Sequence, residues 1–219
     1  MNGSKIFSTI DLNSGYWQVE MEESSRQFTA FTTPKGLYQF KVMPFGLKNA
    51  PATFMRLMEN VLSGYNGEFC QVYLDDILIY SPDFNTHLIH LAKVLERLKI
   101  HGLTCQIKKC KFAAINVEYL GHILTPDGLE RQTEKNKAIE DFPRPKTKRQ
   151  LRGFLGLCGW YSGFVPRFEE KVAPLTDLLQ GSRLFKWCSI HQNTLDLIKK
   201  EITQASKLAY LDYQKKMCL

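Results

Sequence analysis

Apolar and polar residues alternate in several short stretches of the first half of the chain, with the period of two that is typical of β-strands. In residues 5–12, Ile6, Ile10 and Leu12 fall on one face of such a strand, and Asp11 falls on the other. The predicted strands are residues 5–12, 17–22, 28–32 and 37–42, of which the last two flank a turn with Pro34 and Gly36 and predict a hairpin.

Two longer stretches have the 3.6-residue period of an amphipathic helix. The first begins at Asn49, a favourable N-cap, has Pro51 in its first turn and ends at Gly64. Its apolar face consists of Phe54, Leu57, Met58, Val61 and Leu62, and that of the second helix consists of Leu88, Leu91, Leu95 and Leu98. Between the helices lie two β-rich runs, 69–74 and 77–81, so we expect an α+β domain built on antiparallel hairpins.

The second half predicts mainly helices. Residues 117–124 read as one arm of a hairpin that ends at Pro126, and residues 143–145 form a proline-rich boundary. Thr147 with Gln150, and Ser189 with Gln192, have the spacing of a capping box at the start of a helix.

The net charge is unevenly distributed. The chain has a formal charge of +7 over 219 residues, but residues 1–99 carry 9 basic and 10 acidic side chains, whereas residues 100–219 carry 20 and 12. This excess of +8 in the second half indicates a polyanionic partner that is contacted mainly there.

Several classes of protein are excluded or disfavoured by the composition. With 44% hydrophobic and 23% charged residues, the chain is an ordinary globular sequence and not a disordered, collagen-like or coiled-coil one. No stretch reaches the roughly 20 apolar residues that span a bilayer, so we expect no membrane partner and an intracellular location. The six cysteines form no Cys-x-x-Cys pair, which argues against a zinc site or a disulfide framework.

Two adjacent acids, Asp75 and Asp76, lie between apolar strand-forming runs, where an unpaired buried carboxylate costs several kcal/mol. Asp11 is a third acid at the end of a separate strand. Carboxylates on neighbouring strands can bind two divalent ions about 3.5–4 Å apart for phosphoryl transfer, and hard oxygen ligands favour Mg²⁺. The alternative is that these acids are solvated turn residues.

Several strings resemble the successive polymerase motifs of a reverse transcriptase, most closely those of gypsy-type (Metaviridae) LTR retrotransposons. They are FSTIDLNSGY (7–16), VMPFGLKNAPATF (42–54), YLDDILIYS (73–81), YLGH (119–122), FLGLCGWY (154–161) and APLTDLL (173–179). The resemblance implies an RNA-directed DNA polymerase with an α+β palm of antiparallel sheet and packed helices, followed by a mostly helical thumb/connection region.

The resemblance also implies the catalytic centre. Asp11, Asp75 and Asp76 would be the catalytic acids, and together with the Leu12 carbonyl they would hold two Mg²⁺ ions, which Mn²⁺ could replace. On the nucleotide side the matching residues are Tyr16, Phe45, Gly46 and Lys109. From the residues alone, Tyr16 could also be a core tyrosine that closes a turn, and Lys109 could be an ordinary solvated lysine.

Template and primer contacts are implied for two groups of residues. The primer-gripping hairpin and its surroundings correspond to Tyr73, Tyr119, Leu120, Gly121 and His122, and a phosphate-tracking basic run corresponds to Arg144, Lys146, Lys148, Arg149 and Arg152. On sequence grounds the basic run could also be a solvated helix face.

The expected organisation is a palm with a remnant of the fingers in residues 1–104, the end of the palm with the primer-grip hairpin in 105–145, and thumb/connection helices in 146–219. We expect a fragment of a Pol polyprotein that lacks most of the fingers and the RNase H domain. Its partners would be an RNA or DNA template–primer, a dNTP and other parts of the polyprotein, in the cytoplasm or a virus-like particle. The alternative function is that of a catalytically silent retroelement remnant that binds nucleic acid without polymerising.

Overall fold

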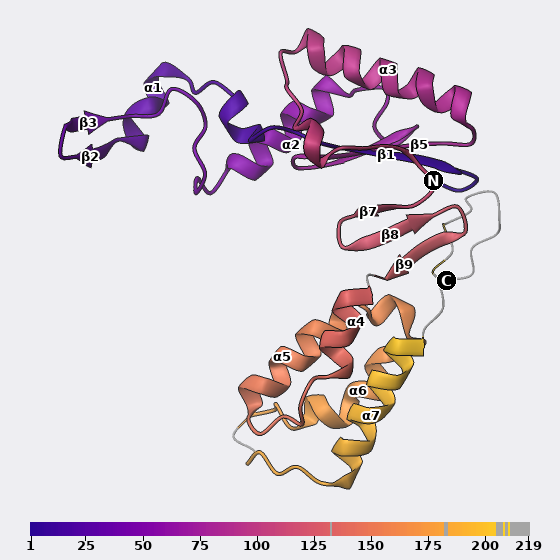
Figure 1. Ribbon diagram of the computed structural model, residues 1–219. Helices are drawn as coiled ribbons and strands as arrows, with labels where there is room; N and C mark the ends of the chain where they lie inside the picture. Colours follow the sequence, from indigo (N-terminus) through magenta and orange to yellow (C-terminus); the bar gives the residue numbers. More distant parts are fainter. Residues whose placement is uncertain (132, 182–183, 205–207, 209, 211–219) are drawn as a thin grey trace. The chain divides into compact units, whose positions relative to one another are not determined.

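The computed structural model describes residues 1–131, 133–181, 184–204, 208 and 210. The described residues form two compact units, which are treated separately (Figure 1). Unit 1 consists of residues 1–120 and 124–126, and unit 2 of residues 121–123 and 127–210. The predicted regions 1–104, 105–145 and 146–219 stay a prediction, and residues 211–219 of the last one lie outside the described residues.

A four-stranded antiparallel sheet forms the centre of unit 1, in the order β4-β5-β1-β6. Figure 1 labels its two central strands, β5 and β1. The strands of this sheet are β1 (Ile6–Asp11), β4 (Cys70–Tyr73), β5 (Asp76–Ser81) and β6 (Lys111–Ala114). The strands predicted at residues 5–12, 69–74 and 77–81 are therefore confirmed, with ends shifted by at most one residue. Because side chains alternate across a strand, Ser8 and Ile10 face one side of the sheet and Thr9 and Asp11 face the other.

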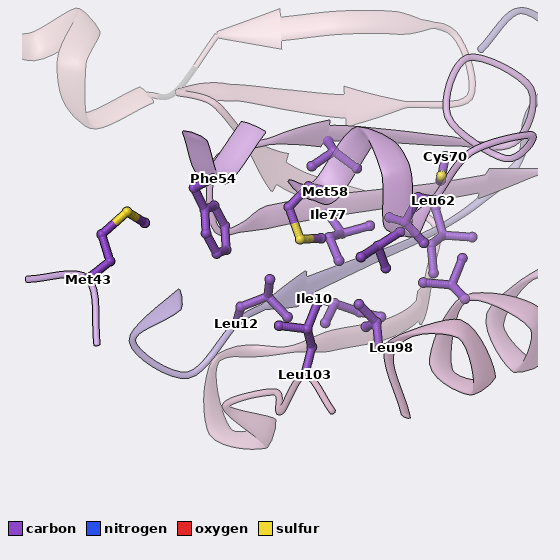
Figure 2. Close-up of a cluster of buried hydrophobic side chains, with 14 of the residues drawn as sticks. Ile10, Leu12, Met43, Phe54, Met58, Leu62, Cys70, Ile77, Leu98 and Leu103 are labelled. Atoms are coloured by element: carbon purple, nitrogen blue, oxygen red, sulfur yellow. The ribbon is translucent and has the colours of Figure 1, made fainter. Parts of the chain in front are cut away.

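Helices α2 (Ala50–Val61) and α3 (Phe84–Ile100) pack against the sheet and close the main core. Figure 2 shows Ile10 and Ile77 from the strands gathered with Met58, Leu62 and Leu98. The apolar face predicted for α2 is confirmed, since Phe54, Met58, Val61 and Leu62 are buried and Leu57 packs against them. Asn49 precedes the helix as predicted, but its side chain makes no capping hydrogen bond.

The apolar face predicted for α3 is partly wrong. Leu98 is buried and Leu91 partly buried, but Leu88 and Leu95 are exposed, and His87 and Val94 take their places against the sheet. His87 faces the sheet because its ring takes part in a hydrogen-bond network there. The Nε2 atom of His87 lies 2.6 Å from Ser8 Oγ, and its Nδ1 atom lies 2.9 Å from Ser81 Oγ.

This network forms hydrogen bonds to both ring nitrogens of His87, whose side chain is fully buried. Ser81 Oγ also lies 2.9 Å from His90 Nδ1, and Ser8 Oγ accepts a hydrogen bond from the Ala113 amide. A neutral His87 satisfies both serine hydroxyls, because one ring nitrogen donates and the other accepts. Burial, and to a lesser extent His90, lowers the pKa of His87 from the usual 6.5.

We therefore expect the free energy of unfolding to fall as the pH falls below about 6.5. The unfolded chain protonates His87 near that pH, whereas the folded chain resists until the pH is lower, so this contribution is present above 6.5 and lost below it. Urea denaturation at pH 7, 6 and 5 should show a steeper loss for the natural chain than for His87→Gln, which cannot titrate. Equal losses in the two chains would contradict this role of His87.

The strand predicted at residues 17–22 is wrong. A 3-10 helix, η1 (Gly15–Gln18), occupies its beginning, after Ser14 in the left-handed region at φ 51°. The side chain of Gln18 donates to the carbonyls of Asn13 and Thr104 and accepts from the Thr104 amide, which holds this turn against the chain that follows α3. Only an isolated bridge between Glu20 and Val42 is sheet-like.

The hairpin predicted around residues 33–36 is present but shorter than expected. It consists of β2 (Phe31–Thr33) and β3 (Gly36–Tyr38), and Thr33 pairs with Gly36. The short elements before it are α1 (Glu23–Arg26) and η2 (Gln27–Thr29).

The single hairpin arm predicted at residues 117–124 is also wrong, because this stretch contains a turn of its own. Strands β7 (Val117–Tyr119), β8 (His122–Thr125) and β9 (Gly128–Arg131) form a sheet in that order. Leu120 and Gly121 both have positive φ, at 48° and 77°, as a tight hairpin turn requires.

Unit 2 is mostly helical, as predicted. It contains α4 (Thr133–Glu140), α5 (Lys148–Gly159), η4 (Ser162–Phe164), α6 (Phe168–Asp177) and α7 (Ser189–Gln204), around a core that includes Phe154, Tyr161 and Ile198. Thr147 caps α5 as predicted, since its hydroxyl accepts from the Gln150 amide. At α7 the capping prediction is wrong, because His191 Nδ1 accepts from the Cys188 amide and Ser189 is already helical. No helix in the described ranges is long and apolar enough to cross a membrane.

Candidate active site

Two of the predicted catalytic acids are direct neighbours across the sheet. Asp11 ends β1 and Asp76 begins β5, and the two residues are paired in the antiparallel register. Cross-strand partners have Cβ atoms about 4.5–5.5 Å apart, so both carboxylates lie at the same edge of the sheet. They line a hollow of about 170 Å³ together with Lys109, Lys111, Glu118, Tyr119 and Leu120.

Asp75 lies in the two-residue turn that connects β4 and β5, beside these acids. Its carbonyl accepts a hydrogen bond of 3.0 Å from the Leu12 amide, which ties the turn to the end of β1. Leu74, the first turn residue, has φ 53°, a conformation that residues other than glycine rarely adopt. Backbone strain of this kind clusters at functional sites.

The side chain of Asp75 points towards η1 and α2 rather than into the hollow. A Cβ atom on Gly15 would lie 2.6 Å from Asp75 Oδ1 and 2.7 Å from Phe54 Cζ, so the carboxylate packs directly on this glycine. Asp75 Oδ1 is buried and has no hydrogen-bond partner in the described part of the chain. A buried carboxylate oxygen without a partner is costly unless a cation or a donor is added.

Mutual repulsion adds to this cost. The pKa of Asp75 is raised, first by burial and then by the charges of Asp11 and Asp76. The pKa of Asp76 is raised by burial and by Asp11, and Lys109 opposes the rise at both carboxyls. Lys109 Nζ lies 3.5 Å from Asp11 Oδ2.

The donor set suits a divalent cation in its chemistry. It consists of three carboxylates and the Leu12 carbonyl, which accepts no hydrogen bond from the described residues, and all four offer the hard oxygen atoms that Mg²⁺ prefers. The partnerless Asp75 Oδ1 supports the same assignment. In the described residues, however, no three acidic, histidine or cysteine side chains converge as a ready-made metal cluster, because Asp75 faces Gly15.

The residues predicted to meet the nucleotide form an aromatic group next to Asp75. The ring of Tyr16 lies 5.3 Å from that of Phe45 and 5.4 Å from that of Phe54, and burial and the Asp75 charge raise its pKa. Phe45 and Gly46 line a neighbouring hollow of about 380 Å³, to which Trp17 also contributes. Tyr16 is thus partly buried against the core, and its contact with a nucleotide stays a prediction.

The predicted primer-side residues of unit 1 lie close to the acids. Tyr119 and Leu120 line the hollow that holds Asp11 and Asp76, and the Tyr119 hydroxyl donates to the Gln71 carbonyl at 3.5 Å. Tyr73 is exposed at the end of β4.

Within unit 2, the ring of His122 stacks on Trp160 and on Phe164, with centroids 5.7 and 6.0 Å apart. Gly121 precedes His122 in the turn described above.

Two side chains of the basic run contact other residues of unit 2, and the other three are exposed without an ion pair to a described residue. The Arg144 guanidinium lies over the Trp187 ring at 5.6 Å, and Lys148 Nζ donates to the Gly181 carbonyl at 2.9 Å. Lys146, Arg149 and Arg152 are exposed, and none of them forms an ion pair with a described residue.

A family comparison identifies the chain. Residues 1–124 match the model of the family described as reverse transcriptase (RNA-dependent DNA polymerase). The chain belongs to the reverse transcriptase family.

Two relatives illustrate the range of this family. The retrovirus-related Pol polyprotein from transposon 297 of Drosophila melanogaster is 43% identical over 176 residues, which cover 80% of this chain and 17% of that protein. The enzymatic polyprotein of cauliflower mosaic virus (strain D/H) is 34% identical over 203 residues, which cover 92% of this chain and 30% of that protein. The chain therefore spans less than a third of the length of either reverse transcriptase relative.

A solved structure of the family has the same fold. The foamy viral protease-reverse transcriptase in complex with double-stranded DNA matches with a TM-score of 0.88 and 31% identity, over 95% of this chain and 37% of that one. This likeness confirms the α+β palm that the sequence predicts.

Three residues that the sequence does not single out lie at this candidate site. Gly15 supports the Asp75 carboxylate, Trp17 lines the hollow beside Phe45, and Lys111 lines the hollow beside Asp11. The only available signal was at Gly15, a residue without a side chain directly before the predicted nucleotide-binding Tyr16. Trp17 falls in the predicted strand 17–22, which does not form, because this residue lies in η1.

Proposed function

We propose that this chain is the catalytic core of an RNA-directed DNA polymerase. In this reaction the 3′-hydroxyl of a primer attacks the α-phosphate of a dNTP, a new P–O bond forms, and pyrophosphate leaves. The observation that carries the proposal is the juxtaposition of Asp11 and Asp76 at one sheet edge with the partnerless Asp75 carboxylate beside them, in a chain of this family.

Asp11, Asp75, Asp76 and the Leu12 carbonyl would hold two Mg²⁺ ions, which Mn²⁺ could replace. When bound, such ions activate the attacking oxygen and neutralise the charge that develops on the phosphate oxygens. The chain's own contribution is to bring the acids together against their repulsion. Asp11 and Asp76 are fixed by strand pairing, and Asp75 is fixed by the hydrogen bond between its carbonyl and the Leu12 amide.

The aromatic group beside Asp75 would bind the sugar and base of the nucleotide. The Tyr16 ring packs against Phe45 and Phe54, which fixes its position. The 2′-hydroxyl of a ribonucleotide would collide with this ring. Phe45 and Gly46 would line the same site, and Lys109 would meet the triphosphate. An RNA or DNA template–primer would contact Tyr73, Tyr119, Leu120, Gly121 and His122 near its primer strand. In support, the foamy viral protease-reverse transcriptase has solved structures in complex with double-stranded DNA and with an RNA/DNA hybrid.

The exposed Lys146, Arg149 and Arg152 would bind phosphates of the duplex, together with Arg144 and Lys148 of the same basic run. We expect the double variant Arg149→Gln and Arg152→Gln to bind a primer–template duplex about ten-fold more weakly at low salt and to lower the slope of log affinity against log salt by about two, because each lost phosphate contact releases one counterion fewer. Fluorescence anisotropy across a salt series measures both quantities.

Lys186→Gln with Lys200→Gln is the matched control, because it removes the same charge from exposed positions of unit 2. Its salt slope should equal that of the natural chain. If both double variants lower the slope equally, the basic run has no special role and the effect is one of net charge.

Primer extension tests the proposed activity. The chain, and a longer version preceded by the corresponding upstream segment of a family member, should be incubated with an RNA template, a DNA primer, dNTPs and Mg²⁺. Extension that disappears with EDTA supports a polymerase. If neither version extends the primer while both bind it, the alternative of a silent remnant that only binds nucleic acid holds instead.

A further inference from the structure

Lys109 forms an ion pair with an acid of the candidate site, in addition to the contact with a nucleotide proposed above. Its ammonium lies 3.5 Å from Asp11 Oδ2 and lines the same hollow as Asp11 and Asp76. Among the described residues, this is the ion pair of the acid cluster: the ammonium contacts Asp11, and its charge also opposes the raised pKa values of Asp75 and Asp76. Lys109 is therefore the positive charge that offsets their repulsion before any metal arrives.

The backbone at Lys109 is fixed while its side chain is free to move. The Lys109 amide donates to the Gln106 carbonyl at 2.9 Å, and the Gln106 amide donates to the Asp11 carbonyl at 2.8 Å. This chain of bonds anchors η3 (Ile107–Lys109) to the end of β1. The Lys109 side chain is 60% exposed, against 23% for Asp11, so the ammonium can leave the carboxylate for water at little cost.

We propose that Lys109 and a divalent cation compete for the Asp11 carboxylate, so that metal binding releases the Lys109 ammonium. This inference rests on the proposed metal site. Competition follows from the geometry, because a cation bound at Asp11 Oδ2 meets an ammonium that already occupies the space next to the same oxygen. The released ammonium remains on its anchored backbone at the edge of the site, where it is available to an incoming triphosphate. A lysine that is needed for the nucleotide is thus kept paired until the metal is present.

Metal binding without nucleic acid or nucleotide tests the competition directly. Titration of the chain with Mn²⁺, followed by electron paramagnetic resonance of the free ion, gives its affinity. We expect Lys109→Gln to bind Mn²⁺ about two- to five-fold more tightly than the natural chain, which is the range that an exposed ion pair can impose. Lys109→Arg keeps a cation at the same place and should bind Mn²⁺ like the natural chain.

Lys111→Gln is the matched control for general electrostatics. Lys111 lines the same hollow but forms no ion pair with a described acid. Its loss should raise the Mn²⁺ affinity clearly less than the loss of Lys109. Equal affinities of Lys109→Gln and Lys111→Gln would overturn the specific competition while leaving the metal site intact. A failure of every variant to bind Mn²⁺ would overturn the metal site and the competition together.

A second measurement follows the lysine itself. Brief treatment with an amine-acetylating reagent and peptide mass spectrometry should show Lys109 reacting faster when Mg²⁺ is added, because the amine leaves its carboxylate partner. Lys108, the preceding residue, makes no ion pair with the described acids and serves as the internal reference. A ratio of Lys109 to Lys108 acetylation that does not change with Mg²⁺ would contradict the release.

Discussion

Asp75→Asn is expected to abolish primer extension, by about a thousand-fold or more, without lowering the stability of the fold. The carboxylate has a buried oxygen without a partner, and its pKa is raised by burial and by the neighbouring acids. Removal of its charge therefore relieves repulsion in the folded chain while it removes a proposed metal ligand. Both quantities, the extension rate and the stability, should be measured on the same preparation. The single-turnover extension rate should fall, whereas the temperature of thermal unfolding should rise or stay the same.

Glu68→Gln is the control for this variant, since Glu68 is an exposed acid of unit 1 away from the site. It should keep the extension rate within two-fold. Extension by Asp75→Asn at the natural rate would remove Asp75 from the catalytic acids. A large loss of stability would mean that the carboxylate has a structural role that its surroundings do not suggest.

Gly15→Ala is expected to have the second-largest effect. The added methyl group would lie 2.6 Å from Asp75 Oδ1 and 2.7 Å from Phe54 Cζ. Both distances are shorter than a van der Waals contact, so one of these side chains must move. Because Phe54 belongs to the packed core, the Asp75 side chain should give way. A displacement of about 1 Å at a catalytic group can cost about a hundred-fold in rate, so we expect a loss of this size together with weaker Mn²⁺ binding.

The control for this substitution is Gly153→Ala in α5, where an added methyl group meets nothing within 4 Å. It should leave Mn²⁺ binding unchanged and should stabilise unit 2 slightly, because alanine favours a helix more than glycine does. If Gly15→Ala binds Mn²⁺ and extends primers like the natural chain, Gly15 does not position Asp75.

The parts of the site that sequence could predict are those fixed by local pattern. The strand at residues 5–12 and the β-rich runs around Asp75 and Asp76 follow from alternation, and their pairing places Asp11 opposite Asp76. The motif spacing singled out the same acids. Helix α2 followed from its apolar period, because its buried face is continuous and meets a single core.

The parts that could not be predicted depend on contacts between distant residues. Alternation at residues 17–22 resembles a strand, but the Gln18 side chain bonds to Thr104, 86 residues away, and stabilises a turn instead. The buried face of α3 is rotated towards His87 because Ser8 and Ser81 offer partners for its ring. The contact of Asp75 with Gly15 likewise exists only once β1, the turn and α2 are assembled.

Metal-dependent nucleotide transfer is the activity that we propose for Asp11 at the end of β1 and for Asp75 and Asp76 at the turn that leads into β5. Its most direct test is the incorporation of a single complementary deoxynucleotide opposite an RNA template base, by the chain and by its version with an upstream segment. We expect incorporation with Mg²⁺ or Mn²⁺, none with EDTA, and none in Asp11→Asn or Asp75→Asn. Incorporation that persists in EDTA or in either variant would contradict this proposal, and so would the absence of incorporation in both versions of the chain.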